Sequence, residues 1–376
     1  MSSSLTPSPA PTSGTPTRPD LLSLLATVPD PRDPRGRQHR LPTILAVGLA
    51  AVLAGARSFV AIGEWVAHQP AHALAPLGVH GRGPEESTIR RAFARLEGDT
   101  LDLVLGAYLR TRTSVVAGRR IIALDGKTVR GARTKTTTAP HLVAAYDHGA
   151  GAVLGQVAVA AKSNEIPAVQ GLLGLFELGG TVVTVDAMHT QTGTANLITA
   201  AGADYVFTVK ANQPTLHAAC KDLPWAKVRV GHRATTTGHG RTVTRTLKVI
   251  TAPDWITFAG AAQVAQLRRT VTQAGKRTVE VVYLITSADH IAAPPATLAV
   301  WVQGHWGIEN RLHWVRDVTY DEDRSQVRTG NAPQVMATLR NTAISLLRLT
   351  GWDNIAAGLR HHARTPDSPL KLLMTC

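Results

Sequence analysis

The chain has 376 residues, enough for two or three domains, and its 44% hydrophobic and 18% charged residues are ordinary for a globular protein and exclude extended disorder. Forty Lys and Arg against 26 Asp and Glu give a net charge of +14, which favours a polyanionic partner, although RNA and anionic lipid fit this charge as well as DNA does. The two cysteines, Cys220 and Cys376, are too few for a disulfide framework or a cysteine-rich zinc site, so we expect a cytoplasmic protein.

The first part of the chain divides into a tail and a helical region. Residues 1–19 are rich in Ser, Thr and Pro without apolar periodicity, which predicts a disordered tail. Residues 20–110 repeat apolar side chains at helical spacing, which predicts an all-helical N-terminal domain. The longest apolar run, residues 41–56, is too short to span a membrane and predicts a buried helix. No secretion signal is expected, because no basic flank followed by an apolar run begins the chain.

One predicted helix in this region is basic. The segment ESTIRRAFARLEG offers Ser87 or Thr88 as a helix cap, followed by Arg90, Arg91 and Arg95 between apolar side chains. This pattern fits a DNA-binding helix. It fits an ordinary amphipathic helix with a solvated basic face equally well, and both interpretations stay open.

The remaining sequence alternates between strand and helix patterns. Residues 111–213 predict three strands, a helix, a strand, a helix and a strand, an order that implies a mixed sheet with flanking helices. Residues 214–295 alternate Thr and Val with polar residues between Gly-rich breaks, which predicts a β-rich insertion. Residues 296–376 return to helical patterns, with one long helix over residues 301–318 and a second that ends at Gly351. The predicted class is α/β.

Two aspartates stand at the ends of predicted strands. Asp125 follows the first apolar strand, in an expected turn LDGK, and Asp186 follows the strand GTVVTV. The carboxyl ends of neighbouring strands in an open sheet are where active sites gather. Either residue taken alone could instead be a turn former or a helix cap, but two in one βα unit favour a site.

A third carboxylate is expected on the helix predicted over residues 301–318. At about 100° per residue, His305, Glu309, His313 and Arg316 fall on one polar face beside an apolar stripe. This face could also be simply solvated. An acidic run after the helix offers rival ligands or a solvated loop: Asp317, Asp321, Glu322 and Asp323.

Three converging carboxylates would suit two Mg²⁺ ions, hard cations that prefer oxygen ligands. Such a pair activates the attacking oxygen and stabilises the leaving oxygen in an in-line displacement at phosphorus. A zinc hydrolase is not expected, because no helix carries two His four residues apart with a Glu base between them.

Seven sequence strings resemble a known family. They are DPRDPRGRQHRL, ALDGKTVRGA, KSNEIPAV, VTVDAMHTQ, DYVFTVKANQPTL, HWGIENRLHWVRDVTYDED and LRNTAISLL. Together they resemble the DDE transposases of bacterial insertion sequences, specifically the subgroup that includes the H-repeat-associated proteins. The resemblance covers nearly everything from Asp20 onward.

The resemblance implies a fold, a reaction and a metal site. The fold is an RNase H-like catalytic core interrupted by the β-rich insertion, and the reaction is cleavage and strand transfer of an insertion sequence. The implied metal-binding triad is Asp125, Asp186 and Glu309, which holds two Mg²⁺ ions, with Mn²⁺ able to substitute. The implied partners are double-stranded DNA, as terminal inverted repeats and target, and a second copy of the chain in a homodimer. The alternative is a non-catalytic DNA-binding relic of a transposase.

The chain departs from the wider family near the glutamate. Where that family carries Tyr, Arg, Glu and Lys, this sequence has Val302, His305, Glu309 and Arg316. Arg316 is expected to replace one phosphate contact, because a guanidinium binds phosphate in a bidentate manner. The other residues predicted to contact DNA are Lys127, Arg130, Lys210, Asn212, Gln213 and His305.

Two tryptophans flank Glu309 in the sequence. Trp306 and Trp314 could stack on an extruded base, as aromatic side chains do in base-flipping enzymes. The alternative is that they are ordinary core or interface residues, the interpretation that large aromatic side chains favour.

Overall fold

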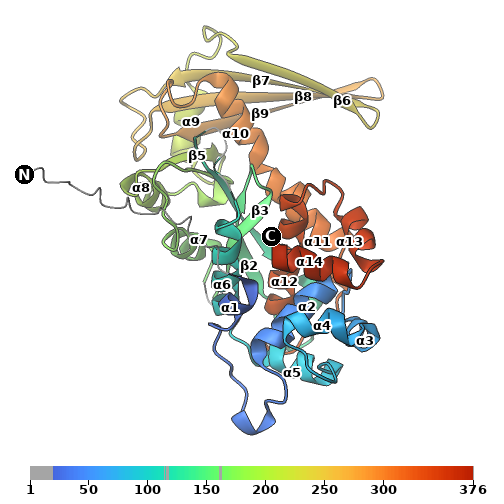
Figure 1. The fold of residues 1–376 in the computed structure, drawn as a ribbon. Coiled ribbons are helices and arrows are strands. Elements are labelled where there is room, and N and C mark those ends of the chain that lie inside the picture. The colour runs from blue at the N-terminus through green and yellow to red at the C-terminus, as the bar shows by residue number, and fades with distance from the viewer. Residues whose placement is uncertain (1–19, 114, 116–117, 161–162, 376) are drawn as a thin grey trace, which may run out of the picture.

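The computed structural model describes residues 20–113, 115, 118–160 and 163–375, so the predicted tail, residues 1–19, lies outside the described residues. Its strands form a single nine-stranded mixed sheet in the order β3-β2-β1-β4-β5-β9-β8-β7-β6 (Figure 1). Their bounds are β1 (Ile121–Thr128), β2 (His141–Asp147), β3 (Ala152–Ala158), β4 (Val182–Val185), β5 (Asp204–Val209), β6 (His232–Gly238), β7 (Arg241–Thr251), β8 (Gln263–Gln273) and β9 (Lys276–Thr286).

The first five strands follow the expected order. An antiparallel meander β1-β2-β3 is followed by helix α7 (Glu165–Leu173), strand β4, helix α8 (Thr192–Ala200) and strand β5. Strand β4 pairs in parallel with both β1 and β5. All four residues of β4 are buried, which explains why this strand is continuously apolar in the sequence. The predicted α/β class and the predicted succession of elements are confirmed.

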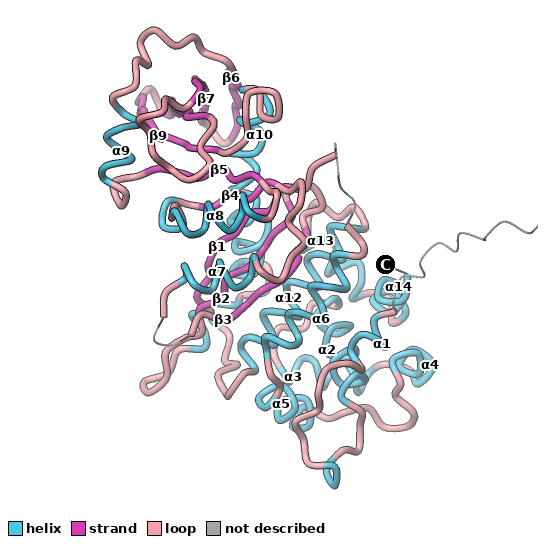
Figure 2. The backbone as a smooth tube through the Cα atoms, turned by 90° about the vertical axis from the view of Figure 1, so that its left-hand side faces the viewer, coloured by secondary structure: helices cyan, strands magenta, loops and turns pink. Residues whose placement is uncertain are grey.

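The insertion extends the same sheet. Strands β6 to β9 are antiparallel, and β9 pairs with β5, so the long hairpins project from the core as a continuation of it (Figures 1 and 2). The predicted β character of residues 214–295 is confirmed, with one addition. Helix α9 (Pro214–Lys221) opens this segment, where the Pro at its first turn supplies a favourable start.

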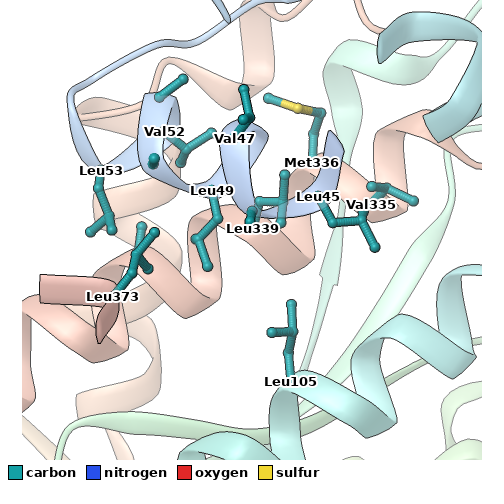
Figure 3. Close-up of a cluster of buried hydrophobic side chains, with 14 of the residues drawn as sticks. Leu45, Val47, Leu49, Val52, Leu53, Leu105, Val335, Met336, Leu339 and Leu373 are labelled. Carbon is teal, nitrogen blue, oxygen red and sulfur yellow. The ribbon is translucent and has the colours of Figure 1, made fainter. Parts of the chain in front are cut away.

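The N-terminal region is helical, and helix α2 lies at its centre. Twelve of the residues of α2 are buried, which confirms the buried helix expected there. Its apolar side chains pack against Leu105, Leu339 and Leu373 from three other helices, so the first and last parts of the chain share one hydrophobic core (Figure 3). The helices of this region are α1 (Leu21–Leu25), α2 (Leu41–Leu53), α3 (Phe59–His68), α4 (Ala71–Leu74), α5 (Glu86–Arg95) and α6 (Gly98–Arg110).

A search of the described residues found no helix long and apolar enough to cross a membrane.

The basic helix α5 begins slightly earlier than expected, because Glu85 rather than Ser87 or Thr88 occupies the cap position. Its arginines Arg90 and Arg91 are exposed, and Arg90 pairs with Glu86 at 2.9 Å. Both interpretations of this helix remain open.

The helix predicted over residues 301–318 is not continuous. Helix α10 (Pro295–His305) gives way to a π-helical turn at Glu309–His313, and α11 (Trp314–Val318) follows. A π turn inserts residues into the helical repeat, so side chains beyond it no longer follow the 100° rule. The expectation that Arg316 shares a face with Glu309 was wrong for this reason.

The C-terminal helices close the core. Helix α12 (Ala332–Leu349) is followed by α13 (Ile355–Ala363) and α14 (Asp367–Thr375). The chain turns after α12 at Gly351, whose φ of +88° lies in the left-handed region that favours glycine, and this confirms the predicted helix end.

A buried carboxylate joins α6, β3 and α12. Asp102 accepts hydrogen bonds from Gln156 Nε2, Gln334 Nε2 and Thr338 Oγ1 at 2.7 to 3.2 Å. Burial raises the pKa of the Asp102 carboxyl to about 7, against the opposing effect of these donors. The network therefore fixes the sheet against the helices through one acid.

Replacing Asp102 by Ala should destabilise the fold by about 3 kcal/mol, because buried donors lose their acceptor. The free energy of unfolding from urea titration measures the effect. Asp353→Ala is the control, since the Asp353 side chain is 99% exposed. A loss below about 1 kcal/mol, the size of an ordinary neutral hydrogen bond, would contradict the structural role of Asp102.

Candidate metal-binding active site

The two aspartates lie side by side at one edge of the sheet. Leu124 of β1 pairs in parallel with Val185 of β4, so the next residues, Asp125 and Asp186, are neighbours across the strands. The sequence predicted a turn at Asp125, and this was wrong. Strand β1 continues to Thr128, paired with β2 alone. Strand β4 ends at Val185 and leaves this side of β1 open at Asp125. An open edge at the ends of parallel strands is the usual place for an active site.

The segment from α10 to α11 crosses this edge and brings the third acid. A cavity of about 240 Å³ is lined by Asp125, Asp186 and Glu309, together with His305 and Lys210. Helix α10 packs on β1 and β4, which places its C-terminal end and the following π turn over the aspartates. The structure thus brings together the three carboxylates that the sequence singled out.

A buried histidine lies between two of the acids. His313 Nδ1 is 3.4 Å from Asp125 Oδ2 and 3.6 Å from Glu309 Oε2. The adjacent His313 imidazole holds the pKa of Glu309 at about 2, and burial only partly opposes this effect. Burial lowers the pKa of His313, but the two carboxylates outweigh it and the pKa is raised overall. Glu309 is therefore ionised at neutral pH.

The donor set fits a divalent cation. Single ligand atoms of Asp125, Glu309 and His313 all lie within 4.8 Å of one another. In the part of the chain that the structure describes, the buried Asp125 Oδ2 accepts no hydrogen bond, as expected for an oxygen that serves a metal. Asp186 lines the same cavity, but it is outside this close group, and its Oδ1 accepts from the Met188 backbone N–H at 2.8 Å. Oxygen-rich sites of this kind suit Mg²⁺ and Mn²⁺.

His305 faces the carboxylates from α10. Its Nδ1 is 3.0 Å from Thr184 Oγ1, which in turn is 3.2 Å from His148 Nε2. Burial lowers the pKa of His305, although Asp125, Asp186 and Glu309 each act to raise it. Burial likewise lowers the pKa of His148 to about 3. His305 is therefore held at the cavity by Thr184, which also contacts His148.

Lys127 and Arg130, both predicted to contact DNA, differ in their availability. They line a neighbouring hollow of about 400 Å³ that shares Glu309 with the carboxylate cavity. Lys127 Nζ is 2.7 Å from Asp317 and only 9% exposed, so its charge is already paired. Arg130 is 76% exposed, with Asp323 at 3.6 Å, and is accessible to a ligand.

The polar residues after β5 lie beside Asp186. Lys210 is exposed at the cavity. The Asn212 amide donates to the Ala187 carbonyl at 2.7 Å, and the Gln213 amide donates to the Thr190 carbonyl at 2.9 Å. Both amides therefore hold the loop that follows Asp186, while Lys210 keeps its charge at the opening.

Arg316 does not reach the site. It is fully buried, where its guanidinium contacts Glu322 at 2.6 Å and Glu322 also contacts Arg340 at 2.8 Å. The expected phosphate contact of Arg316 was wrong, and so was the interpretation of Glu322 as part of a solvated loop. The charges of this cluster form part of the core.

Trp306 and Trp314 are 39% and 57% exposed, so neither ring belongs to the hydrophobic core. Trp306 lines the carboxylate cavity, and Trp314 lines the hollow that contains Lys127. The two rings therefore flank Glu309 on the surface, where stacking or interface contacts remain the available interpretations.

A second cluster escaped the sequence analysis. Glu165, at the start of α7, accepts from His141 Nε2 at 2.6 Å and from His189 Nε2 at 3.0 Å. Burial acts to raise the pKa of Glu165, but the two histidines lower it to about 2. A Cβ on Gly126 would lie 2.5 Å from Glu165 Oε2, so glycine beside Asp125 is required. The signals in the sequence were the strings KSNEIPAV, which contains Glu165, and VTVDAMHTQ, which contains His189.

Comparison with known proteins identifies the family of the chain. The model of the family described as "Transposase DDE domain" matches residues 117–346, more than half of the chain, and a model described as "DDE_Tnp_1-associated" matches residues 22–109. The chain belongs to the DDE-domain transposase family.

Individual relatives are similar over most of their length. The chain is 32% identical to "Putative transposase YncI" of Escherichia coli O157:H7, covering 87% of each chain. It is 29% identical to "H repeat-associated putative transposase YhhI" of Escherichia coli K12, covering 92% of this chain and 94% of that one. Among solved structures, a piggyBac transposase synaptic complex with hairpin DNA aligns with a TM-score of 0.46 at 12% identity, covering 94% of this chain and 77% of that one.

Proposed function

We propose that the chain cuts the ends of an insertion sequence and joins them to target DNA, with Asp125, Asp186 and Glu309 as the catalytic acids on an RNase H-like core. The observation that carries this proposal is the parallel pairing of Leu124 with Val185, which sets the two aspartates side by side under Glu309. Family membership supports the reaction class. Such a protein acts in the bacterial nucleoid, as a homodimer that brings two DNA ends together.

The residues of the site fit divalent-metal chemistry. Two bound Mg²⁺ ions, or Mn²⁺ in their place, would supply an activated oxygen nucleophile and stabilise the leaving oxygen. The three carboxylates would hold the cations, and the buried Asp125 Oδ2, 3.4 Å from His313 Nδ1, would be one of the ligand oxygens. His305, whose Nδ1 lies 3.0 Å from Thr184 Oγ1, forms part of the lining beside the acids.

A DNA cleavage and joining assay tests the proposal. Labelled duplexes that carry the DNA flanking the gene on either side are incubated with the full chain and a target plasmid, in Mg²⁺ or in EDTA. We expect nicks at the element ends and covalent joining to the plasmid in Mg²⁺ alone. Binding without cleavage would instead identify a DNA-binding relic, and hydrolysis without joining would identify a stand-alone nuclease.

A further inference from the structure

Three arginines share one face of the β insertion. Arg245 of β7 lies directly opposite Arg269 of β8, and Arg241 lies four residues from Arg245 on the same strand. Residues that face each other across an antiparallel pair, and residues an even number apart on one strand, project from the same side of a sheet. Arg241, Arg245 and Arg269 are therefore neighbours, and we refer to them as the arginine face.

The arginine face continues into the wall of the carboxylate cavity. Leu267, two residues from Arg269, lines that cavity together with Asp125. The Arg245 guanidinium is 5.9 Å from the centre of the Trp306 ring. Trp306 lines the carboxylate cavity and also an adjacent hollow of about 540 Å³ to which Arg245 contributes. A path thus leads from the acids, past Trp306, to the arginines.

The charges of the arginine face are only partly neutralised inside the protein. Among the described residues, Arg241 and Arg245 have no ion-pair partner, and Arg269 has only Glu280, at 3.6 Å. Arg245 Nε is buried and has no hydrogen-bond acceptor in the described part of the chain. Burial, followed by the charges of Arg269 and Arg241, lowers the pKa of Arg245. Like charges directly opposite one another destabilise a sheet, so this arrangement favours an external polyanion.

We propose that the arginine face binds the phosphate backbone of the DNA strand whose phosphodiester enters the carboxylate cavity, with Trp306 as the surface between the two. The inference rests on the proposed function and adds to it the path of the substrate strand. A guanidinium matches phosphate oxygens in a bidentate manner, and three of them along one face suit a repeating backbone rather than a single ion.

The opposite face of the same strands supplies a matched control. Arg268, Arg277 and Arg233 are exposed, and their cross-strand partners place them on the other side of the sheet. The test compares Arg241→Gln/Arg245→Gln/Arg269→Gln with Arg233→Gln/Arg268→Gln/Arg277→Gln. Both variants lose the same formal charge. Binding of labelled element-end duplex and of its single strand is followed by fluorescence anisotropy in EDTA over a salt series.

The arginine-face variant should bind DNA at least about tenfold more weakly, and its salt dependence should fall by about one unit of slope for each phosphate that the variant no longer binds. The control variant should bind nearly as the unaltered protein does. Equal weakening in the two variants, or no weakening in either, would overturn the inference and indicate only a general charge effect. If the triple variant does not fold, Arg241→Gln alone serves, because Arg241 is exposed.

Failure of the proposed function has a separate outcome. DNA binding by the unaltered chain without any cleavage in Mg²⁺ would remove the catalytic proposal, whereas the comparison of the two faces would still decide where the backbone binds. Cleavage by the unaltered chain, together with unchanged binding by the arginine-face variant, would retain the catalytic proposal and overturn the inference.

Discussion

Asp125→Asn should reduce Mg²⁺-dependent cleavage of element-end DNA by about a thousandfold or more, while DNA binding persists. The substitution keeps the size of the side chain but removes the anionic oxygen that is buried without a hydrogen-bond donor. Lewis-acid stabilisation by a bound metal contributes several kcal/mol to such reactions, and each 1.36 kcal/mol corresponds to about tenfold in rate. Cleavage rates under single-turnover conditions, with binding measured in parallel, give both quantities.

The control for this variant is Asp254→Asn, which removes the same charge from an exposed loop outside the cavity. Titration with Mn²⁺ provides a readout independent of catalysis, because the variant should bind the ion more weakly than the control does. Undiminished cleavage by Asp125→Asn would show that the carboxylate site is wrongly assigned. Equal loss in both variants would point to a defect of folding instead.

The positions of the strand aspartates could be predicted from the sequence for a physical reason. A strand buried on both faces must be continuously apolar, so the end of each apolar run marks the edge of the sheet. This locates Asp125 and Asp186 near one edge. The continuation of β1 beyond Asp125 was not predicted, because Lys127 and Thr128, which pair with β2 alone, are polar and interrupt the apolar run.

The helix that carries Glu309 shows where periodicity fails. A regular helix would align Arg316 with Glu309. The residues between them show no sequence preference that predicts the π turn. That turn directs Arg316 into the core, where it pairs with Glu322 beside Arg340. Long-range pairing of this kind depends on tertiary packing, which a pattern of single residues does not encode.

Pairing across distant segments also explains the other contacts that the sequence did not predict. Lys127 is neutralised by Asp317 on α11, and Glu165 joins His141 to His189 from three separate elements. The alternating pattern of β7 and β8 predicted strands, but the register that sets Arg245 opposite Arg269 follows from the hairpin geometry. Sequence patterns therefore predicted the carboxylates, whereas the charged residues that pair around them were identified only from the structure.

Glu322→Gln should destabilise the fold by about 3 to 5 kcal/mol, because it leaves Arg316 and Arg340 buried without their counter-charge. All three side chains are at most 1% exposed, so solvent cannot replace the lost carboxylate. Urea unfolding at pH 7 measures the difference. Glu177→Gln, at an exposed position, is the control. A change below about 1 kcal/mol, the scale of an exposed ion pair, would contradict a structural role for the cluster.

The pH dependence of this variant provides a second test. Burial acts to raise the pKa of Glu322, but Arg316 and Arg340 outweigh it and hold the pKa at about 2, below the ordinary value of 4.5. A carboxyl with a depressed pKa in the folded state stabilises the fold fully above its unfolded pKa, and this contribution is lost as the pH falls toward 2. The difference in unfolding free energy between the unaltered chain and Glu322→Gln should therefore be constant above about pH 5 and shrink on acidification. A difference that grows as the pH falls would require another group to set the stability of this core.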